Sequence, residues 1–285
     1  MATKLLGECG VIKDIQQEED LSIPSYFWDR KRAETLKMLN RNLKSIFPES
    51  DSFYQFVDFG TGRGEDLLML YEGIEQKIRS RIFFCGVDAI KERLESLRQV
   101  LEQKKISDIK IVLHDISQRL PFEDESVDFV YSSEVVEHLL SPESFFAEIR
   151  RVLKKNGYFL LTTMNQPNFL EKEYWCNKFG FSSGKKKPEE IPYEEVVIDG
   201  KAVQIHGHIS LRPTADWDAC LNQEGFHLVD VARGALRYAL PAKLNRLSIV
   251  KYLLFFLEAF LDIFPRKWTR GFSCQTIGLY QLKSI

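Results

Sequence analysis

The sequence predicts an α/β fold, in which a doubly wound, seven-stranded, mostly parallel sheet carries helices on both faces and lid-like insertions. Short apolar runs alternate with helical patterns from Phe53 to Met164, as in chains that build a parallel sheet. The first run ends in an acid and a glycine-rich turn, the layout of a cofactor site at a sheet edge. Two later strand patterns complete the sheet, and we expect the last strand to be reversed.

The turn after the first strand is the most informative segment. Three alternating glycines from Gly60 to Gly64 follow Asp58 and allow a ligand to approach the backbone closely. A dinucleotide fingerprint needs a glycine where Glu65 stands, and Asp66 adds a second carboxylate to the first helical turn. Two fixed negative charges disfavour a pyrophosphate there, and with it a dehydrogenase. S-adenosylmethionine (SAM), which has an ammonium, a sulfonium and no phosphate, fits better; a turn that binds nothing is the alternative.

The next two strands also lead to acids. Residues 81–88 end at Asp88, which can accept two hydrogen bonds from a ribose diol, each worth about 1.5–3 kcal/mol. A helix cap is an alternative role that does not exclude the first. Residues 109–113 lead to Asp115, which can accept from an adenine amino group while Ile116 packs on the ring. A plain turn residue is equally consistent with Asp115.

Two further strands flank a helix. They are expected at Ser126–Ser133 and Tyr158–Met164, with the helix at about Ser141–Leu153 between them. Pro142 suits its first position, and Asn156-Gly157 is expected to close it.

Five segments, taken in order, carry a family signature. They are residues 58–64, Val87-Asp88, Leu120–Asp128, Glu134-Val135-Val136-Glu137-His138-Leu139 and Glu148–Gly157. This series resembles the class I SAM-dependent methyltransferases, most closely the small-molecule branch that includes the ubiquinone-pathway methyltransferases. The resemblance covers roughly Phe53 to Asn165, with a weaker similarity at 208–230.

The resemblance implies a Rossmann-like domain and a role for each matching residue in binding SAM. These residues are Asp58, Gly60, Thr61, Gly62 and Gly64 for the methionine part, Asp88 for the ribose, Asp115 and Ile116 for the adenine, and Ser133 near the sulfonium. In relatives an N-terminal arginine or aromatic residue often contacts the cofactor carboxylate, and residues 26–32 are the candidate segment here. We expect a helical segment at 1–52, a SAM-binding domain at 53–285, and insertions at about 165–212 and 233–272.

Composition narrows the function classes. The chain has 285 residues and a net charge of −2, so it shows no general attraction to nucleic acid. Its five cysteines lack paired spacing, which argues against a zinc site or a disulfide framework. The polar N-terminus does not resemble a signal peptide, and we expect a cytoplasmic protein.

The first insertion and its histidines are expected to form the acceptor pocket. Asp199-Gly200 predicts a hairpin that can cover the cofactor. His138 and His208 are the candidate catalytic bases, although a structural histidine is equally plausible at 138. His206 and His208 could hold a metal, but no acid or cysteine stands near them at ligand spacing, so no metal is expected.

The second insertion contains an unusually apolar helical pattern at 249–264. At about 24 Å it is shorter than the ~30 Å that a membrane span needs. Three interpretations are open. The segment is an extra helix packed on the domain, an interfacial helix anchored by basic and aromatic residues up to 270, or a homodimer surface. The first two suggest a lipid-like acceptor.

Together these patterns predict SAM-dependent methyl transfer to a small or lipid-like acceptor, more often at oxygen in this family. A methyltransferase that acts on a macromolecule is one alternative. A non-catalytic SAM-fold scaffold is another, although the intact motif around Asp58 and Asp88 argues against it.

Overall fold

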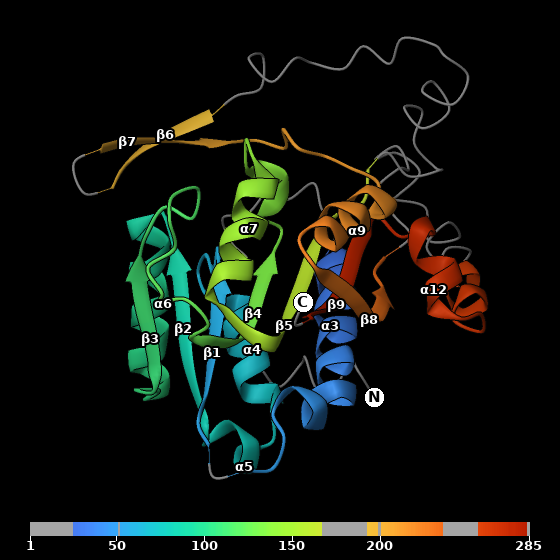
Figure 1. Cartoon of the computed structure of the whole chain (residues 1–285), viewed down its shortest axis with the longest axis horizontal. Helices are drawn as coiled ribbons and strands as arrows, with labels where there is room; N and C mark the ends of the chain where they lie inside the picture. The colour runs from blue at the N-terminus through green and yellow to red at the C-terminus, as the bar shows by residue number, and fades with distance from the viewer. Residues whose placement is uncertain (1–24, 51, 167–192, 199–200, 236–255, 284–285) are drawn as a thin grey trace.

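A seven-stranded sheet forms the centre of the computed structural model, which describes residues 25–50, 52–166, 193–198, 201–235 and 256–283. The strand order is β3-β2-β1-β4-β5-β9-β8. The strands are β1 (Tyr54–Phe59), β2 (Ile82–Asp88), β3 (Ile109–Leu113), β4 (Val127–Ser133), β5 (Leu153–Met164), β8 (Phe226–Arg233) and β9 (Gln275–Leu282). β9 runs antiparallel to both β5 and β8, and the pairs among β1 to β5 are parallel. The doubly wound sheet and its reversed last strand are therefore confirmed (Figure 1).

Helices cover both faces of this sheet (Figure 1). They are α3 (Ser25–Ile46), α4 (Glu65–Gly73), α5 (Gln76–Arg79), α6 (Lys91–Lys104), α7 (Pro142–Val152), α9 (Thr214–Gln223) and α12 (Arg266–Thr269), with 3₁₀ turns η1 (Val136–His138) and η3 (Arg270–Phe272). Residues 256–261 are also helical.

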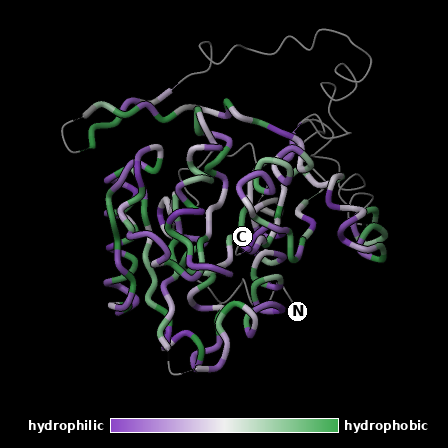
Figure 2. The backbone as a smooth tube through the Cα atoms, viewed as in Figure 1, coloured by the Kyte–Doolittle hydropathy of each residue, from purple (hydrophilic) through white to green (hydrophobic). Residues whose placement is uncertain are grey.

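Two apolar layers result from strands that are buried on both faces. Tyr54 and Phe56 of β1 belong to the cluster that contains side chains of α3, α4 and α6. Val57 and Phe59 of the same strand belong to the cluster with α7 and α9, where Trp217 is fully buried. The apolar stretches of the central strands are visible along the tube in Figure 2.

One local expectation is wrong. The helix α7 ends at Val152, and Asn156-Gly157 lies inside β5 rather than closing the helix. Asn156 has φ 64°, and the β4–β5 register shifts between Val127 and Phe129. The Asn-Gly pair therefore lies at an irregularity in the strand. Such irregularities, like helix ends, favour residues that tolerate positive φ.

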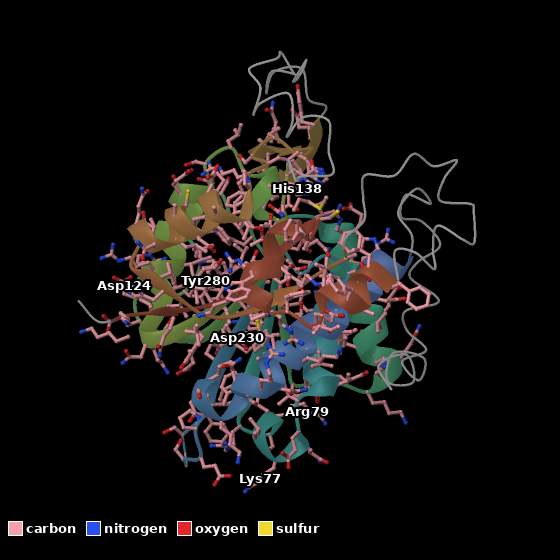
Figure 3. The ribbon with its side chains drawn as sticks, turned by 90° about the vertical axis from the view of Figure 1, so that its right-hand side faces the viewer. Lys77, Arg79, Asp124, His138, Asp230 and Tyr280 are labelled. Atoms are coloured by element: carbon pink, nitrogen blue, oxygen red, sulfur yellow. The ribbon has the colours of Figure 1, made fainter. Side chains whose placement is uncertain are left out.

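The hairpin of the first insertion is present as a separate two-stranded sheet. β6 (Tyr193–Ile198) pairs antiparallel with β7 (Lys201–His206), and Ile198 faces Lys201. The predicted turn residues, 199–200, and the aromatic segment 174–181 lie outside the described residues. In Figure 1 the hairpin lies across one end of the main sheet, and Figure 3 places His138 at this end and Lys77 at the opposite one.

The described part of the second insertion is held against α3 by ion pairs. Arg30 lies 3.3 Å from Glu258 and 3.0 Å from Asp262, and Arg233 lies 2.5 Å from Asp262. Residues 236–255, which include the start of the predicted 249–264 helix, lie outside the described residues. Among the described residues, every helix is too short or too polar to cross a bilayer.

The turn between β1 and α4 needs glycine for two different reasons. Gly60 has φ 77°, and a Cβ there would lie 2.2 Å from Cγ2 of Val135. Gly62 has φ 57°, yet a Cβ there would meet nothing within 4 Å. The first glycine prevents a clash with the β4–η1 connection, whereas the second leaves open space beside the turn.

Gly60→Ala should therefore destabilise the fold more than Gly62→Ala. Both substitutions place an alanine at positive φ, which costs about 1–2 kcal/mol. Only Gly60→Ala adds overpacking, worth about 1–3 kcal/mol more. Urea denaturation of the two variants measures the difference, and equal midpoints would contradict the close approach to Val135.

Candidate functional site

Two adjoining cavities open at the carboxyl ends of the central strands. The small cavity has a volume of about 310 Å³, and the large cavity about 710 Å³. Gly60, Arg93 and Glu134 line both, so the two form one continuous site. The β6–β7 hairpin contributes Tyr193 and Val203 to the wall of the large cavity, as expected for a covering insertion. Their combined size is in the range that accommodates a cofactor together with a second small molecule.

Most of the residues predicted from the sequence meet at this site. The small cavity is lined by Asp58, Gly60, Thr61, Gly62 and Ser133, and the large cavity by Gly60, Asp88, Asp115, Ile116 and His138. Gly64 lines neither cavity, because its position packs against Leu97. His208 also lines neither, but its ring centroid lies 4.8 Å from that of His138.

Asp58 offers an unused acceptor in the small cavity. Its Oδ2 accepts a hydrogen bond from Thr61 Oγ1 at 2.7 Å, while its Oδ1 is buried without a partner among the described residues. Burial, together with the nearby carboxylates of Asp66 and Asp88, raises the pKa of Asp58 to about 8. A cationic donor that reached Oδ1 would relieve this cost, so the atom fits the ammonium of a bound amino acid.

Asp88 has a structural role and also faces the large cavity. Its Oδ2 accepts from Gly62 N and its Oδ1 from Ile90 N, both at 2.8 Å. Burial raises the pKa of Asp88 against the effect of these backbone bonds. Asp88 therefore caps the start of α6, as the alternative interpretation held. Each of its carboxylate oxygens still has a lone pair that can accept from a ribose hydroxyl.

The adenine candidates show a similar combination. Asp115 Oδ1 accepts from Ser117 N at 2.9 Å, which is the turn role considered from the sequence. Ile116 is 7% exposed and forms an apolar part of the large cavity wall. An acid beside an apolar surface suits a flat ring that carries an amino group.

An ion-pair network buried under the small cavity connects α3 to α4. Asp66 lies 2.7 Å from both Lys31 Nζ and Arg32 Nε, and Arg32 also pairs with Glu65. The hydroxyl groups of Tyr131 and Ser133 donate to Asp66 Oδ2 at 2.9 and 2.7 Å. Burial opposes ionisation, but Lys31 and Arg32 outweigh it and hold the pKa of Asp66 well below its usual range.

This network corrects the electrostatic argument drawn from the sequence. Glu65 and Asp66 are not free to attract a cation, because α3 neutralises both. Lys31 and Arg32 instead line the small cavity, within the 26–32 segment expected to meet the cofactor carboxylate. Asp58, and not the pair in the first turn of α4, is the acid available to an ammonium.

Sequence reasoning missed two acids beside the histidines. Glu134 follows β4 with φ 53° and lines both cavities, and burial and then Glu137 raise its pKa to about 8. Glu137 lies with His138 and His208, although the sequence places no acid at ligand spacing from the His-x-His pair. Burial and then His138 lower the pKa of His208 to about 4, so that its imidazole is neutral at pH 7. The sequence feature that could have indicated these two acids is the Glu-x-x-Glu-His spacing at residues 134–138.

A methyltransferase domain family matches residues 50–202, more than half of the chain. Malonyl-[acyl-carrier protein] O-methyltransferase of Marinomonas sp. (strain MWYL1) is 33% identical over 116 residues, which are 40% of each protein. Sterol 24-C-methyltransferase ERG6B of Gibberella zeae (strain ATCC MYA-4620 / CBS 123657 / FGSC 9075 / NRRL 31084 / PH-1) is 44% identical over 124 residues, which are 41% of this chain and 32% of the relative. The chain thus spans less than half the length of these curated relatives.

Solved structures share the fold. The [4+2]-cyclase SpnF superposes with a TM-score of 0.56 at 15% identity, over 94% of this chain and 86% of SpnF. The YcgJ protein of Bacillus subtilis gives a TM-score of 0.51 at 14% identity, over 88% and 98% of the two chains. With its motifs, strand order and family match, this chain belongs to the class I SAM-dependent methyltransferases.

Removing Lys31 should expose how much the fold depends on the network under the small cavity. Lys31→Met leaves Asp66 with one cation and should lower the free energy of unfolding by about 3 kcal/mol. Adding Asp66→Asn should recover part of that loss, because the remaining charges are then better balanced. Lys37→Met is the matched control on α3, since Lys37 is half exposed and, among the described residues, forms an ion pair only with Glu34. Guanidinium denaturation giving equal losses for Lys31→Met and Lys37→Met would contradict a buried network.

Proposed function

We propose that this chain transfers a methyl group from SAM to an oxygen atom of a small or lipid-like acceptor. The observation that carries the proposal is the pair of joined cavities, one with an unused buried carboxylate oxygen and the other with a ribose-type acid and an apolar wall. The fold and the family match support the donor, and an O-methyltransferase among the relatives supports oxygen as the acceptor atom.

The proposed binding mode assigns one group of residues to each part of SAM. Asp58 accepts from the ammonium, and Lys31 and Arg32 face the carboxylate. Asp88 accepts from the ribose, and Asp115 with Ile116 holds the adenine. When bound, SAM supplies a methyl group on a positively charged sulfur. The chain contributes mainly by positioning, which can supply about 7–11 kcal/mol of the barrier for a displacement of this kind.

The proton of an acceptor hydroxyl has a defined destination in this proposal. Glu134 lines both cavities, and Glu137, His138 and His208 lie beside it. We call these four side chains the Glu-His cluster; Glu134 lines both cavities and His138 lines the large one. We assign proton removal to the Glu-His cluster and not to a single histidine.

Contact with a membrane surface would supply a lipid-like acceptor. Phe260, Ile263 and Trp268 are 54%, 77% and 72% exposed, and Arg266 and Lys267 lie among them. Exposed apolar side chains beside basic ones are typical of an interfacial segment. We propose that residues 256–270 make this contact, and the ion pairs of Arg30 connect the segment to the helix that carries Lys31.

Calorimetry with S-adenosylhomocysteine tests the cofactor assignment. At pH 7 the carboxyl of Asp58, with a pKa of about 8, is largely protonated, and an incoming ammonium requires its ionised form. Binding should therefore release a proton, and the contribution of Asp58 to affinity should grow as pH rises from about 6 toward 8. Asp58→Asn should bind about tenfold more weakly and release fewer protons, as measured in buffers of different ionisation enthalpy.

Asp216→Asn, an exposed change on α9 outside both cavities, is the control and should match the wild type. A wild-type chain that gives no heat with S-adenosylhomocysteine would support the scaffold alternative, and uptake of NADH instead would support a dehydrogenase.

Flotation with vesicles that contain phosphatidylglycerol tests the surface contact. The double variant Phe260→Ser/Ile263→Ser should float less than the wild type, because about 0.8 kcal/mol is lost for each CH₂ group no longer buried in lipid. Phe53→Ser/Phe83→Ser removes two equally exposed rings elsewhere and should not change flotation. Equal flotation of all three proteins would dismiss the membrane contact, and a loss of dimers in the first variant would favour the homodimer reading.

A further inference from the structure

The β6–β7 hairpin has one apolar face and one exposed face. Its register pairs Val196 with Val203. Alternation along the two strands places Ile198 and Ile205 on the same side of the hairpin as this pair. Ile198 is 6% exposed, whereas Val197 on the other side is 70% exposed. A two-stranded sheet is stable in water only when such an apolar face packs against something else.

The apolar face of the hairpin is turned toward the large cavity. Val203 and Ile205 line this cavity, and both are only partly buried, so that apolar surface is left for a bound molecule to cover. The same cavity is lined by Ile90, Asp115 and Ile116, which follow β2 and β3. In Figure 1 the hairpin lies beyond the upper ends of β2 and β3, away from β8 and β9. The hairpin and this part of the sheet edge are therefore two walls of one cavity.

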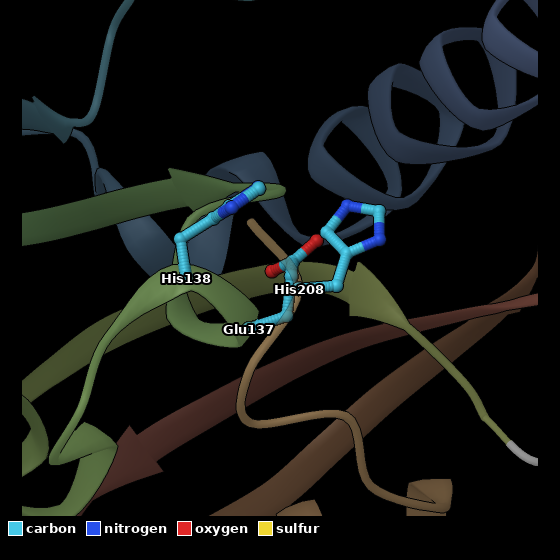
Figure 4. A group of neighbouring side chains, drawn as sticks. All are labelled: Glu137, His138 and His208. Atoms are coloured by element: carbon cyan, nitrogen blue, oxygen red, sulfur yellow. The ribbon is translucent and has the colours of Figure 1, made fainter. Parts of the chain in front are cut away.

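The loop after β7 is fastened to the turn after β4. The carbonyl oxygen of Glu137 accepts from Ile209 N and Ser210 N, both at 2.9 Å. Ser210 Oγ donates to the carbonyl of Leu139 at 2.7 Å. Figure 4 shows His208, the residue before Ile209, beside Glu137 of η1. Because Leu139 itself lines the large cavity, the base of the hairpin is fixed at the cavity wall.

We propose that Val203 and Ile205 cover the face of the adenine opposite Ile116, and we call these two side chains the purine wall. A ligand pocket buries about 70–90% of the surface of its ligand, whereas the sheet edge alone covers one face of a flat ring. The purine wall supplies the apolar surface for the other face. This inference rests on the proposed function, since it takes SAM as the molecule that enters the cavity.

The same assignment decides which ligand the hairpin serves. An acceptor must approach the sulfur of SAM, which the family resemblance places near Ser133 of the small cavity. Val203 and Ile205 line only the large cavity, together with the two adenine residues, Asp115 and Ile116. We therefore assign the hairpin to retention of the cofactor and not to recognition of the acceptor.

Calorimetry with two adenosine compounds tests the purine wall. Val203→Ser/Ile205→Ser should weaken binding of S-adenosylhomocysteine about tenfold, because hydroxyl groups cover a ring face less favourably than apolar side chains do. It should weaken binding of 5′-methylthioadenosine, which lacks the amino-acid part, by the same factor. Val197→Ser/Ala202→Ser, a cross-strand pair on the exposed face, is the matched control and should bind both compounds as the wild type does.

A second variant and a second measurement make the test specific. Asp58→Asn should weaken binding of S-adenosylhomocysteine and leave that of 5′-methylthioadenosine unchanged, because Asp58 is assigned to the ammonium. In the wild type, both compounds should slow hydrogen exchange of the backbone amides in 193–198 and 201–207. This measurement does not depend on whether a hairpin variant folds.

The outcomes separate the two proposals. Equal affinities of Val203→Ser/Ile205→Ser and the wild type for both compounds, or unchanged hydrogen exchange in the hairpin of the liganded wild type, would overturn the purine wall and leave the proposed function standing. A loss limited to S-adenosylhomocysteine would also overturn it, because the hairpin would then contact the amino-acid part. A wild-type chain that binds neither compound would overturn the proposed function and the purine wall with it.

Discussion

The buried contact between α3 and Asp66 is the interaction on which the whole site depends. It joins a helix that precedes the sheet to the first turn after β1, and it uses two cations to hold one carboxylate in its ionised state. With Asp66 neutralised, the small cavity presents Lys31 and Arg32 on one wall and the unused oxygen of Asp58 on another. Opposite charges at two ends of one cavity match the two ends of an amino acid. The same contact fixes Ser133, which lines the small cavity and directly precedes Glu134, a residue that lines both.

The second organising feature is the connection after β4. Glu134 adopts positive φ at the end of the strand, and this sharp turn brings its carboxyl to the wall between the two cavities. The following 3₁₀ turn then places Glu137 and His138 against the loop of His208. Donor binding and acceptor activation are thus assigned to neighbouring parts of one sheet edge. Because the two parts share a wall, a bound donor and a bound acceptor would be in contact without a large rearrangement.

The parts of the structure that were predictable from the sequence are those governed by local pattern. Alternating apolar runs and turn residues placed β1 to β5, and the acids at 58, 88 and 115 all reached the predicted edge. The pairing of Lys31 and Arg32 with Asp66 was not predictable, because it depends on how α3 packs across the sheet. The meeting of Glu137 with His208 depends in the same way on the path of a long insertion. Asn156-Gly157 was misassigned since an Asn-Gly pair favours positive φ in a helix end and in a strand irregularity alike.

The stretch that matches the methyltransferase domain family, residues 50–202, omits two elements on which its packing depends. It omits α3, so a fragment cut at these limits would bury Asp66 with neither of its counterions. It also omits β9, which pairs along β5 from Tyr158 to Met164, and would leave a long strand edge open to other chains. We therefore expect a fragment cut at these limits to aggregate, so the domain borders useful for recombinant work are set by packing rather than by sequence similarity.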